Sequence, residues 1–372
     1  MTKGETCAAI REVSAHFSVS GELVKIELYG NGHINDTYLL TYSRSPAKHM
    51  ILQRMNRNIF QHPEQLMENI NGVTTYLREQ ILQCGGDPER ETLDFKISDS
   101  GKNYYVDGNQ NYWRMCNFIE DSICLESISS PDDFFQSARG FGRFQQLLSD
   151  YPANTLHETI PHFHNTILRF EALKRAVEDD RCDRVKLATR EIRFAMERQA
   201  DVGTLVRLQE NGELPLRVTH NDTKLNNVLL DKATRKALCV IDLDTVMPGL
   251  AANDFGDSIR FGASTGSEDE QDLTKISLDL VLFEQYTKGF LETCGENLTE
   301  REIETLPLGA KMMTFECGIR FLTDYLGGDT YFKTSRDFQN LDRCRTQFKL
   351  VFDMEQKMDA MQAIIRKYKE AL

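Results

Sequence analysis

Apolar and polar residues alternate with a period of two in several short segments of the first third of the chain, which is typical of strands with one buried face. Pro63 then begins a stretch in which apolar residues recur with helical spacing. The elements that this part of the pattern predicts are a short helix at 6–17, strands at 23–29, 37–42 and 49–54, a helix at 63–83, a hairpin with strands near 93–98 and 103–107, and an apolar connector at 112–119.

From about residue 131 onwards the hydrophobic period lengthens to that of α-helices, and one polar hairpin at 218–244 interrupts them. The helices predicted here are 131–149, 163–175, 183–210, 270–293, 299–327 and 338–370. A β-rich part followed by a helical part predicts an α+β chain, and 372 residues exceed what one hydrophobic core usually supports. We therefore expect a small lobe over 1–118, a hinge at about 113–119 and a helical lobe over 119–372.

The composition is that of an ordinary globular protein, with 40% hydrophobic and 27% charged residues. The formal net charge of −13 argues against nucleic-acid and anionic-membrane partners, and no feature indicates a protein partner. No apolar run approaches transmembrane length, and the first residues lack the apolar core of a signal peptide. The nine cysteines are dispersed without a C-x-x-C, so we expect reduced thiols and a cytoplasmic location.

The polar segment around residue 222 has the residue types of a phosphotransferase site. His220, Asp222, Lys224 and Asn227 follow one another in a loop, and an apolar run then ends in Asp242. Protein kinases place a catalytic Asp, a Lys, a metal-binding Asn and a second metal-binding Asp in this order. Phosphoryl transfer needs a carboxylate to deprotonate the attacking hydroxyl and oxygen ligands to hold Mg²⁺. Each piece alone is equally typical of a turn or a buried strand, but the combination predicts an active site.

A glycine turn between the first two strands is a second candidate. Gly30 and Gly32 would let backbone N–H groups approach a phosphate closely. A third glycine would be expected where Asn35 stands, so the same residues could form a plain hairpin turn.

Taken together, these motifs resemble the aminoglycoside phosphotransferase/choline kinase superfamily of small-molecule kinases, and within it the N-acetylhexosamine 1-kinases. The resemblance is sharpest at residues 29–35, 217–230, 241–249, 254–263 and 316–322. It implies a bilobal protein-kinase-like fold that binds ATP between its lobes and uses Mg²⁺. It also implies transfer of the γ-phosphate to the anomeric 1-hydroxyl of N-acetylglucosamine or N-acetylgalactosamine, a small-molecule sugar substrate.

The resemblance also assigns roles to the polar loop. It implies that Asp222 is the catalytic base, that Asn227 and Asp242 bind the metal, and that Lys224 contacts the transferred phosphoryl group.

For the nucleotide, the resemblance implies contacts from Gly30 and Gly32 to the phosphates and from the backbone of Met115 to Phe118 to adenine. Kinases usually carry a phosphate-binding Lys on the third strand, but this chain has Gln53 there.

Arg54 follows Gln53, and because a strand alternates its faces, only one of the two can point toward the phosphates.

For the sugar, the resemblance implies contacts from His33, Asn35, Arg320 and Tyr331. Asp244 lies one strand period beyond the metal-binding carboxylate, so it should share that face and bond to the sugar or to a second metal ion.

Arg320 could instead form a buried ion pair with Glu316 or Asp324.

Two further groups of residues contain functional residue types. Asp254-Phe255-Gly256 spells a kinase metal motif, but it lies too far beyond the polar loop, and we predict that Asp254 caps the backbone of that loop. A solvated or capping role is predicted for His157, His162 and His164, since no nearby Cys completes a zinc site.

Two alternatives stay open from the residues alone. One is a kinase of another small alcohol, such as homoserine, an amino alcohol or an aminoglycoside. The other is a pseudokinase that only binds a nucleotide, for which the missing lysine would be the supporting feature.

Overall fold

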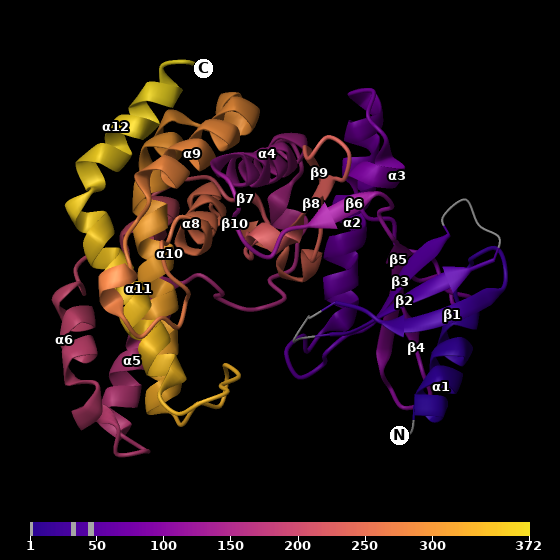
Figure 1. The fold of residues 1–372 in the computed structure, drawn as a ribbon, viewed down its shortest axis with the longest axis horizontal. Coiled ribbons are helices and arrows are strands. Elements are labelled where there is room, and N and C mark those ends of the chain that lie inside the picture. Colours follow the sequence, from indigo (N-terminus) through magenta and orange to yellow (C-terminus); the bar gives the residue numbers. More distant parts are fainter. Residues whose placement is uncertain (1–2, 31–34, 44–47) are drawn as a thin grey trace. The chain divides into compact units, whose positions relative to one another are not determined.

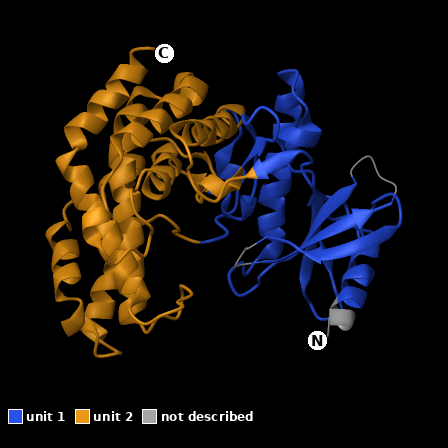
Figure 2. Ribbon diagram, viewed as in Figure 1, with its two compact units in different colours: residues 1–123, 150–160, 229–247 blue, residues 124–149, 161–228, 248–372 orange. Residues whose placement is uncertain are grey.

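The computed structural model describes the chain except residues 1–2, 31–34 and 44–47, and it divides into two compact units (Figures 1 and 2). The sheet unit comprises residues 1–123, 150–160 and 229–247, and the helical unit comprises residues 124–149, 161–228 and 248–372. Both units are therefore assembled from separate segments of the chain.

The sheet unit is built on a five-stranded antiparallel sheet. Its strands, in spatial order, are β1 (Leu23–Leu28), β2 (Asp36–Tyr42), β3 (His49–Arg54), β5 (Tyr112–Asn117) and β4 (Tyr105–Val106). Helix α1 (Lys3–Ala15) buries Ile10 and Val13 in one core cluster with Leu40, Leu52 and Met115 of the strands. The alternation seen in the sequence thus corresponds to a sheet with an apolar face under α1.

Helix α2 (Pro63–Gln83) is the long helix of this unit and begins at Pro63, as predicted. The unit also contains α3 (Pro88–Glu91) and the 3₁₀ turns η1 (Ala153–Thr155) and η4 (Leu243–Thr245). Most of a three-stranded sheet, in the order β6 (Ser122–Cys124), β8 (Val228–Asp231) and β9 (Ala237–Val240), belongs to it as well. Asn69 of α2 donates to the backbone oxygens of His157, at 2.8 Å, and Val246, at 3.1 Å. These bonds connect residues 150–160 and 229–247, the later segments of the sheet unit, to α2.

The helical unit is organised around α10 (Glu300–Leu326), which packs against α8 (Ala251–Gly262), α11 (Gln339–Gln356) and α5 (Thr166–Asp179) (Figure 1). Its other helices are α4 (Pro131–Leu147), α6 (Thr189–Glu197), α7 (Thr204–Glu210), α9 (Leu280–Cys294) and α12 (Met358–Lys369), with 3₁₀ turns η2 (Val185–Leu187), η3 (Leu225–Asn227), η5 (Leu273–Lys275) and η6 (Gly295–Asn297). The short strands β7 (Arg217–Thr219) and β10 (Met247–Gly249) pair beside α8, with β10 beginning at the last residue of the sheet unit.

Two glycines let α8 and α10 approach until their backbones touch. A Cβ atom on Gly256 would lie 2.4 Å from the carbonyl oxygen of Gly309, and one on Gly309 would lie 2.2 Å from that of Ala252. Any larger side chain would therefore push the helices apart. The close contact holds α8 in place, and α8 carries the residues that shape the polar loop.

The structure differs from the predicted elements in several places, among them the predicted helix 270–293, which begins only at Leu280, and α8, which was not predicted. The predicted helix 183–210 is wrong as one element, because it is divided into η2, α6 and α7, and Gly203 precedes the last of these. The predicted helix 338–370 divides at Lys357, whose ammonium group donates to the carbonyl oxygen of Leu278 at 2.8 Å. The predicted strand near 93–98 makes only isolated bridges, since the Ser98 hydroxyl bonds to backbone oxygens and competes with a regular ladder.

Within the described residues, no helix combines the length and the apolar character needed to cross a bilayer. All nine cysteines are free thiols, and burial raises the pKa of Cys116 to about 12 and that of Cys317 to about 11.

Candidate active site

The polar loop that follows β7 is held in shape by Asp254, in the first turn of α8. Its carboxylate accepts the backbone N–H of His220 at 2.9 Å and that of Asn221 at 2.8 Å. Gln145 of α4 donates to the same carboxylate at 2.8 Å, and Asp254 is only 1% exposed. The prediction that Asp254 caps the loop is therefore confirmed.

The next turn of α8 holds the loop on the other side of Asp222. Asp257 accepts the backbone N–H of Thr223 at 3.0 Å, and Ser258 donates to the Thr223 carbonyl at 2.8 Å. Burial would raise the pKa of Asp257, but the neighbouring charges of Arg260 and Lys224 lower it below its usual value. Asp254, Asp257 and Ser258, the residues of α8 that bond to the loop, are spaced three and four apart on one helix face. The sequence contained this spacing, but we did not use it to predict these contacts.

Asp222 lies in the middle of this anchored loop with its side chain partly exposed. Lys224 Nζ is 2.8 Å from Asp222 Oδ1, and Asn227 Nδ2 donates to Asp222 Oδ2 at 3.2 Å and to its backbone oxygen at 2.8 Å. Burial opposes the charge of Lys224, but Asp222 raises the Lys224 pKa above its ordinary value. The loop thus presents a carboxylate with an ammonium group beside it.

The buried imidazole of His220 supports the same loop from behind. Its Nδ1 accepts the backbone N–H of Asp222 at 3.3 Å, and its ring packs edge-on against Phe141 and Phe144 of α4. The sequence placed His220 in the motif, and its role in the structure is to position the backbone of Asp222.

Asn227 and Asp242, the predicted metal ligands, offer oxygen atoms suited to a hard divalent cation. The amide nitrogen of Asn227 is committed to Asp222, and within the described ranges no hydrogen bond reaches its Oδ1. Asp242 has a left-handed backbone, with φ of 59°, immediately before η4. Such a conformation in a non-glycine residue is typical of functional sites, so both residues fit a metal-binding role.

Asp244 lies in a buried polar network of the sheet unit. Arg114 Nη1 is 2.5 Å from Asp244 Oδ1, and Asn35 Nδ2 donates to Asp244 Oδ2 at 2.6 Å. Arg114 Nε also donates to Gln53 Oε1 at 2.9 Å, and Gln53 donates in turn to Thr37 at 3.1 Å. The guanidinium of Arg114 thus links Gln53, predicted to face the phosphates, to Asp244 and, through it, to Asn35, both predicted to bind the sugar.

Arg114 is a residue of this site that the sequence reasoning missed. It is 3% exposed and faces Gln53 across the β3–β5 pair. Burial would lower its pKa, but Asp244 and Asp242 raise it above its ordinary value. The signal was a single charged residue inside an apolar strand, because a buried charge is retained only with a partner.

Arg54 lies on the opposite face of β3 from Gln53. Its Nε donates to Asp36 at 2.8 Å, its guanidinium lies over the ring of Trp113, and its side chain is 45% exposed. Gln53, and not Arg54, therefore shares the face of Arg114.

The predicted nucleotide-binding residues lie in and beside the sheet. Met115 is fully buried in β5, and Phe118 follows β5 with its ring edge-on to Tyr29 and His49. Gly30 has a left-handed backbone, with φ of 74°.

Gly32 and His33 lie outside the described residues. All the nucleotide contacts stay predictions.

Arg320 of α10 lies among aromatic rings of the helical unit. Its guanidinium carbon is 5.3 Å from the ring centre of Phe163, 5.9 Å from that of Tyr331 and 5.5 Å from that of Phe332. Its side chain is 18% exposed, and Glu316 approaches only to 4.0 Å. Within the part of the chain that the structure describes, no hydrogen bond uses the Arg320 donors.

Of the two carboxylates that could pair with Arg320, Glu316 forms a long ion pair with it, at 4.0 Å. Glu316 is bonded to His164 Nδ1 at 3.0 Å and to Thr166. Burial would raise the pKa of Glu316, but His164 lowers it below the usual range.

Asp324 accepts the backbone N–H groups of Thr330 at 3.0 Å, Tyr331 at 2.8 Å and Phe332 at 2.9 Å. It therefore builds the loop that carries two of the three rings around Arg320. The ion-pair alternative with Asp324 is wrong, because this carboxylate is occupied by the loop.

The histidine cluster of the sequence does not form a metal site. His157 bonds to Glu68 at 2.7 Å in the sheet unit, whereas His164 is buried against Glu316 in the helical unit. Among the described residues, no group of three His, Cys, Asp or Glu side chains is placed to hold a metal ion. A solvated or capping role for His164 is wrong, because it is buried in an ion pair.

We expect Asp254→Ala to lower the free energy of unfolding by about 1–3 kcal/mol, because the backbone donors of His220 and Asn221 lose their buried acceptor. Urea unfolding measures the change. The exposed Asp337→Ala is the surface control. A loss no greater than that of Asp337→Ala would show that the cap does not stabilise the loop.

Comparison with known proteins agrees with this geometry. Residues 25–285 match the sequence profile of the APH family, described as "Phosphotransferase enzyme family". An aminoglycoside phosphotransferase from Alicyclobacillus acidocaldarius has a similar structure, with a TM-score of 0.61 and 13% identity over 97% of this chain and 96% of that one. A choline kinase from Cryptosporidium parvum gives 0.60 and 12% identity over 96% and 97% of the two chains.

A third similar structure is an amicoumacin kinase in complex with AMP-PNP, Ca²⁺ and Ami, with a TM-score of 0.57 and 13% identity over 96% of each chain. These likenesses confirm the predicted α+β, protein-kinase-like fold. Because the family profile spans well over half of the sequence, the chain belongs to the phosphotransferase enzyme family.

Proposed function

We propose that this protein is an ATP- and Mg²⁺-dependent kinase that phosphorylates the anomeric 1-hydroxyl of N-acetylhexosamines. Membership of the phosphotransferase family and the anchored loop around Asp222 support the reaction type. The amicoumacin kinase complex with AMP-PNP and Ca²⁺ supports ATP as the donor and a divalent cation as the cofactor. The acceptor is inferred from the charges around Arg320.

The single observation that carries the acceptor class is the pair of guanidinium groups in the helical unit. Arg320 lies above aromatic faces and makes no hydrogen bond from its guanidinium to the described residues, and burial together with the charge of Arg320 lowers the pKa of Arg169. The carboxylate of Glu316 lies beside them, bonded to His164 at 3.0 Å and 4.0 Å from Arg320. Cations such as choline or an aminoglycoside would be repelled here, whereas a neutral sugar gains hydrogen bonds from a guanidinium and contact from aromatic rings.

In the proposed reaction, the carboxylate of Asp222 accepts the proton of the sugar 1-hydroxyl as its oxygen forms a bond to the γ-phosphorus of ATP. The bond from that phosphorus to the β,γ-bridging oxygen breaks, and ADP leaves. When bound, the metal ion neutralises phosphate charge, and Asn227 and Asp242 are the residues that would hold it. Lys224, held 2.8 Å from Asp222, supplies a positive charge beside the transferred group.

An ADP-release assay over a panel of acceptors tests this proposal. N-acetylglucosamine and N-acetylgalactosamine should support turnover that needs Mg²⁺, whereas choline and an aminoglycoside should not. The methyl 1-glycoside of N-acetylglucosamine is the matched control, because only its anomeric hydroxyl is blocked. Turnover of that glycoside would show that a hydroxyl other than the anomeric one is phosphorylated. Turnover of choline would contradict a sugar as the acceptor, and no turnover of any acceptor would favour a pseudokinase.

We expect Arg320→Ala to raise the KM for the sugar by about tenfold or more, because hydrogen bonds from a charged donor contribute about 1.5–3 kcal/mol. The KM for ATP should stay unchanged. Arg366→Ala, which removes an exposed arginine on α12, is the matched control. An unchanged sugar KM in a folded Arg320→Ala protein would return Arg320 to a structural role with Glu316.

A further inference from the structure

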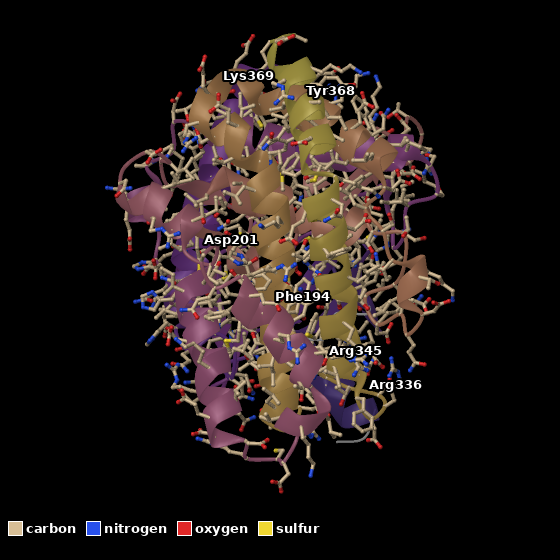
Figure 3. All side chains as sticks on the ribbon, turned by 90° about the vertical axis from the view of Figure 1, so that its left-hand side faces the viewer. Phe194, Asp201, Arg336, Arg345, Tyr368 and Lys369 are labelled. Atoms are coloured by element: carbon tan, nitrogen blue, oxygen red, sulfur yellow. The ribbon has the colours of Figure 1, made fainter. Side chains whose placement is uncertain are left out.

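A hollow lies on the helical unit, at a place to which the proposed reaction gives no role. A pocket of about 650 Å³ is lined by residues of η2 and α6 on one side, by α11 on the other, and by Leu273. Figure 3 faces this side of the helical unit and labels Phe194 of α6 and Arg345 of α11, which both line the pocket. This volume is typical of sites for small organic molecules.

The floor and walls of the pocket are apolar. Phe194 and Phe348 stack with their ring centres 4.7 Å apart, and Phe348 is 4% exposed. Leu187 and Phe352 also line the pocket and are 52% and 46% exposed. Large apolar side chains left open around a hollow, and not scattered singly, are typical of a binding surface.

The rim of the pocket is positively charged. Lys186, Arg190 and Lys349 line it, and among the described residues none of the three makes a hydrogen bond or ion pair to a carboxylate through its side chain. Lys349 lies over the Phe352 ring, with its ammonium nitrogen 5.8 Å from the ring centre. Three unpaired cations around one hollow form a local positive field on a chain whose net charge is −13.

The one acidic side chain in the lining does not cancel this field. Glu191 is 9% exposed, and its Oε1 accepts from Arg345 Nε at 2.6 Å. Arg345 thus neutralises Glu191, and the charge of the other three cations remains available to a ligand.

We propose that this pocket is a binding site for a small organic anion, with an apolar body on the phenylalanine floor and a carboxylate, sulfonate or phosphate group at the cationic rim. An uncharged apolar molecule would leave the rim unused, and a cation would be repelled by it. The proposal is independent of the acceptor of the kinase reaction, because it rests on other residues of the helical unit.

Isothermal titration calorimetry with 8-anilinonaphthalene-1-sulfonate tests the site on the full chain. Saturable binding is expected, and Arg190→Glu should weaken it about tenfold or more, because the rim loses one positive charge and gains a negative one. Arg193→Glu is the matched control, because Arg193 is an exposed residue of the same helix α6 that does not line the pocket. A second variant, Phe352→Asp, removes an apolar wall at an exposed position and should also weaken binding.

The role of charge is tested by competition. Naphthalene-2-sulfonate should displace the dye at lower concentration than 2-naphthol, which carries a similar ring system without a charge at neutral pH. Equal weakening by Arg190→Glu and Arg193→Glu, no weakening by either pocket variant, or equal competition by the two naphthalenes would overturn the proposal. Thermal unfolding of each variant shows that an observed loss does not come from a loss of fold.

Discussion

Replacing Asp222 by Asn is expected to lower kcat by about 10²–10⁴-fold, the contribution of a positioned base in general acid–base catalysis. The substitution keeps the shape of the side chain, so the bond from Asn227 to the backbone oxygen at position 222 can persist. Asp254 and Asp257 hold the neighbouring backbone groups and do not depend on the Asp222 side chain. The affinity for ATP should therefore stay nearly unchanged.

Steady-state kinetics together with ATP binding by calorimetry measure the two effects separately. Asp337→Asn, at an exposed position outside the proposed site, is the control for the loss of one negative charge. If Asp222→Asn kept more than about a tenth of the wild-type kcat, the base would have to be another group.

The largest expected effect on stability comes from Arg114→Met. Arg114 and Asp244 are both nearly fully buried, and removing one partner of a buried ion pair leaves the other charge without compensation. Such a loss typically costs about 3–5 kcal/mol. Because Asn35 and Gln53 bond to the same pair, their positions should also loosen, and the KM for the sugar should rise.

The chain offers a matched control in the same sheet. Arg54→Met removes an arginine from an exposed pair with Asp36, and exposed pairs contribute only about 0–1 kcal/mol. Urea unfolding of the two variants compares buried with exposed pairing at neighbouring strands. The double variant Arg114→Met/Asp244→Leu should recover part of the loss, because no buried charge then remains. An Arg114→Met protein as stable as Arg54→Met would contradict the role of the buried pair.

The spacing of residues along the chain determined much of this protein. The alternation in the first third predicted β1, β2 and β3, and helical periodicity with Pro63 predicted α2. Local reasoning also predicted that Asp254 caps the polar loop, which its bonds to the backbone of His220 and Asn221 confirm. Such features depend on neighbours in sequence, which is why one sequence was enough to predict them.

Helix ends inside long periodic stretches were not predictable in this way. Residues 183–210 and 338–370 keep helical periodicity throughout, yet the chain turns after Glu197 and at Lys357. At this break the Lys357 ammonium group bonds to distant partners, including the carbonyl oxygen of Leu278. A local pattern contains no information on such a partner.

Only the tertiary structure decided which polar side chains act together. Asn35 and Asp244 are 209 positions apart and share a hydrogen bond, and His164 and Glu316 are 152 apart and form a buried pair. That pair engages the carboxylate of Glu316, which lies 4.0 Å from Arg320, and Arg114 meets Gln53 only because β3 and β5 are neighbours in the sheet. A buried charge is stable only where packing brings a partner to it, so the sequence determined the chemistry that is available, and the packing determined which groups share it.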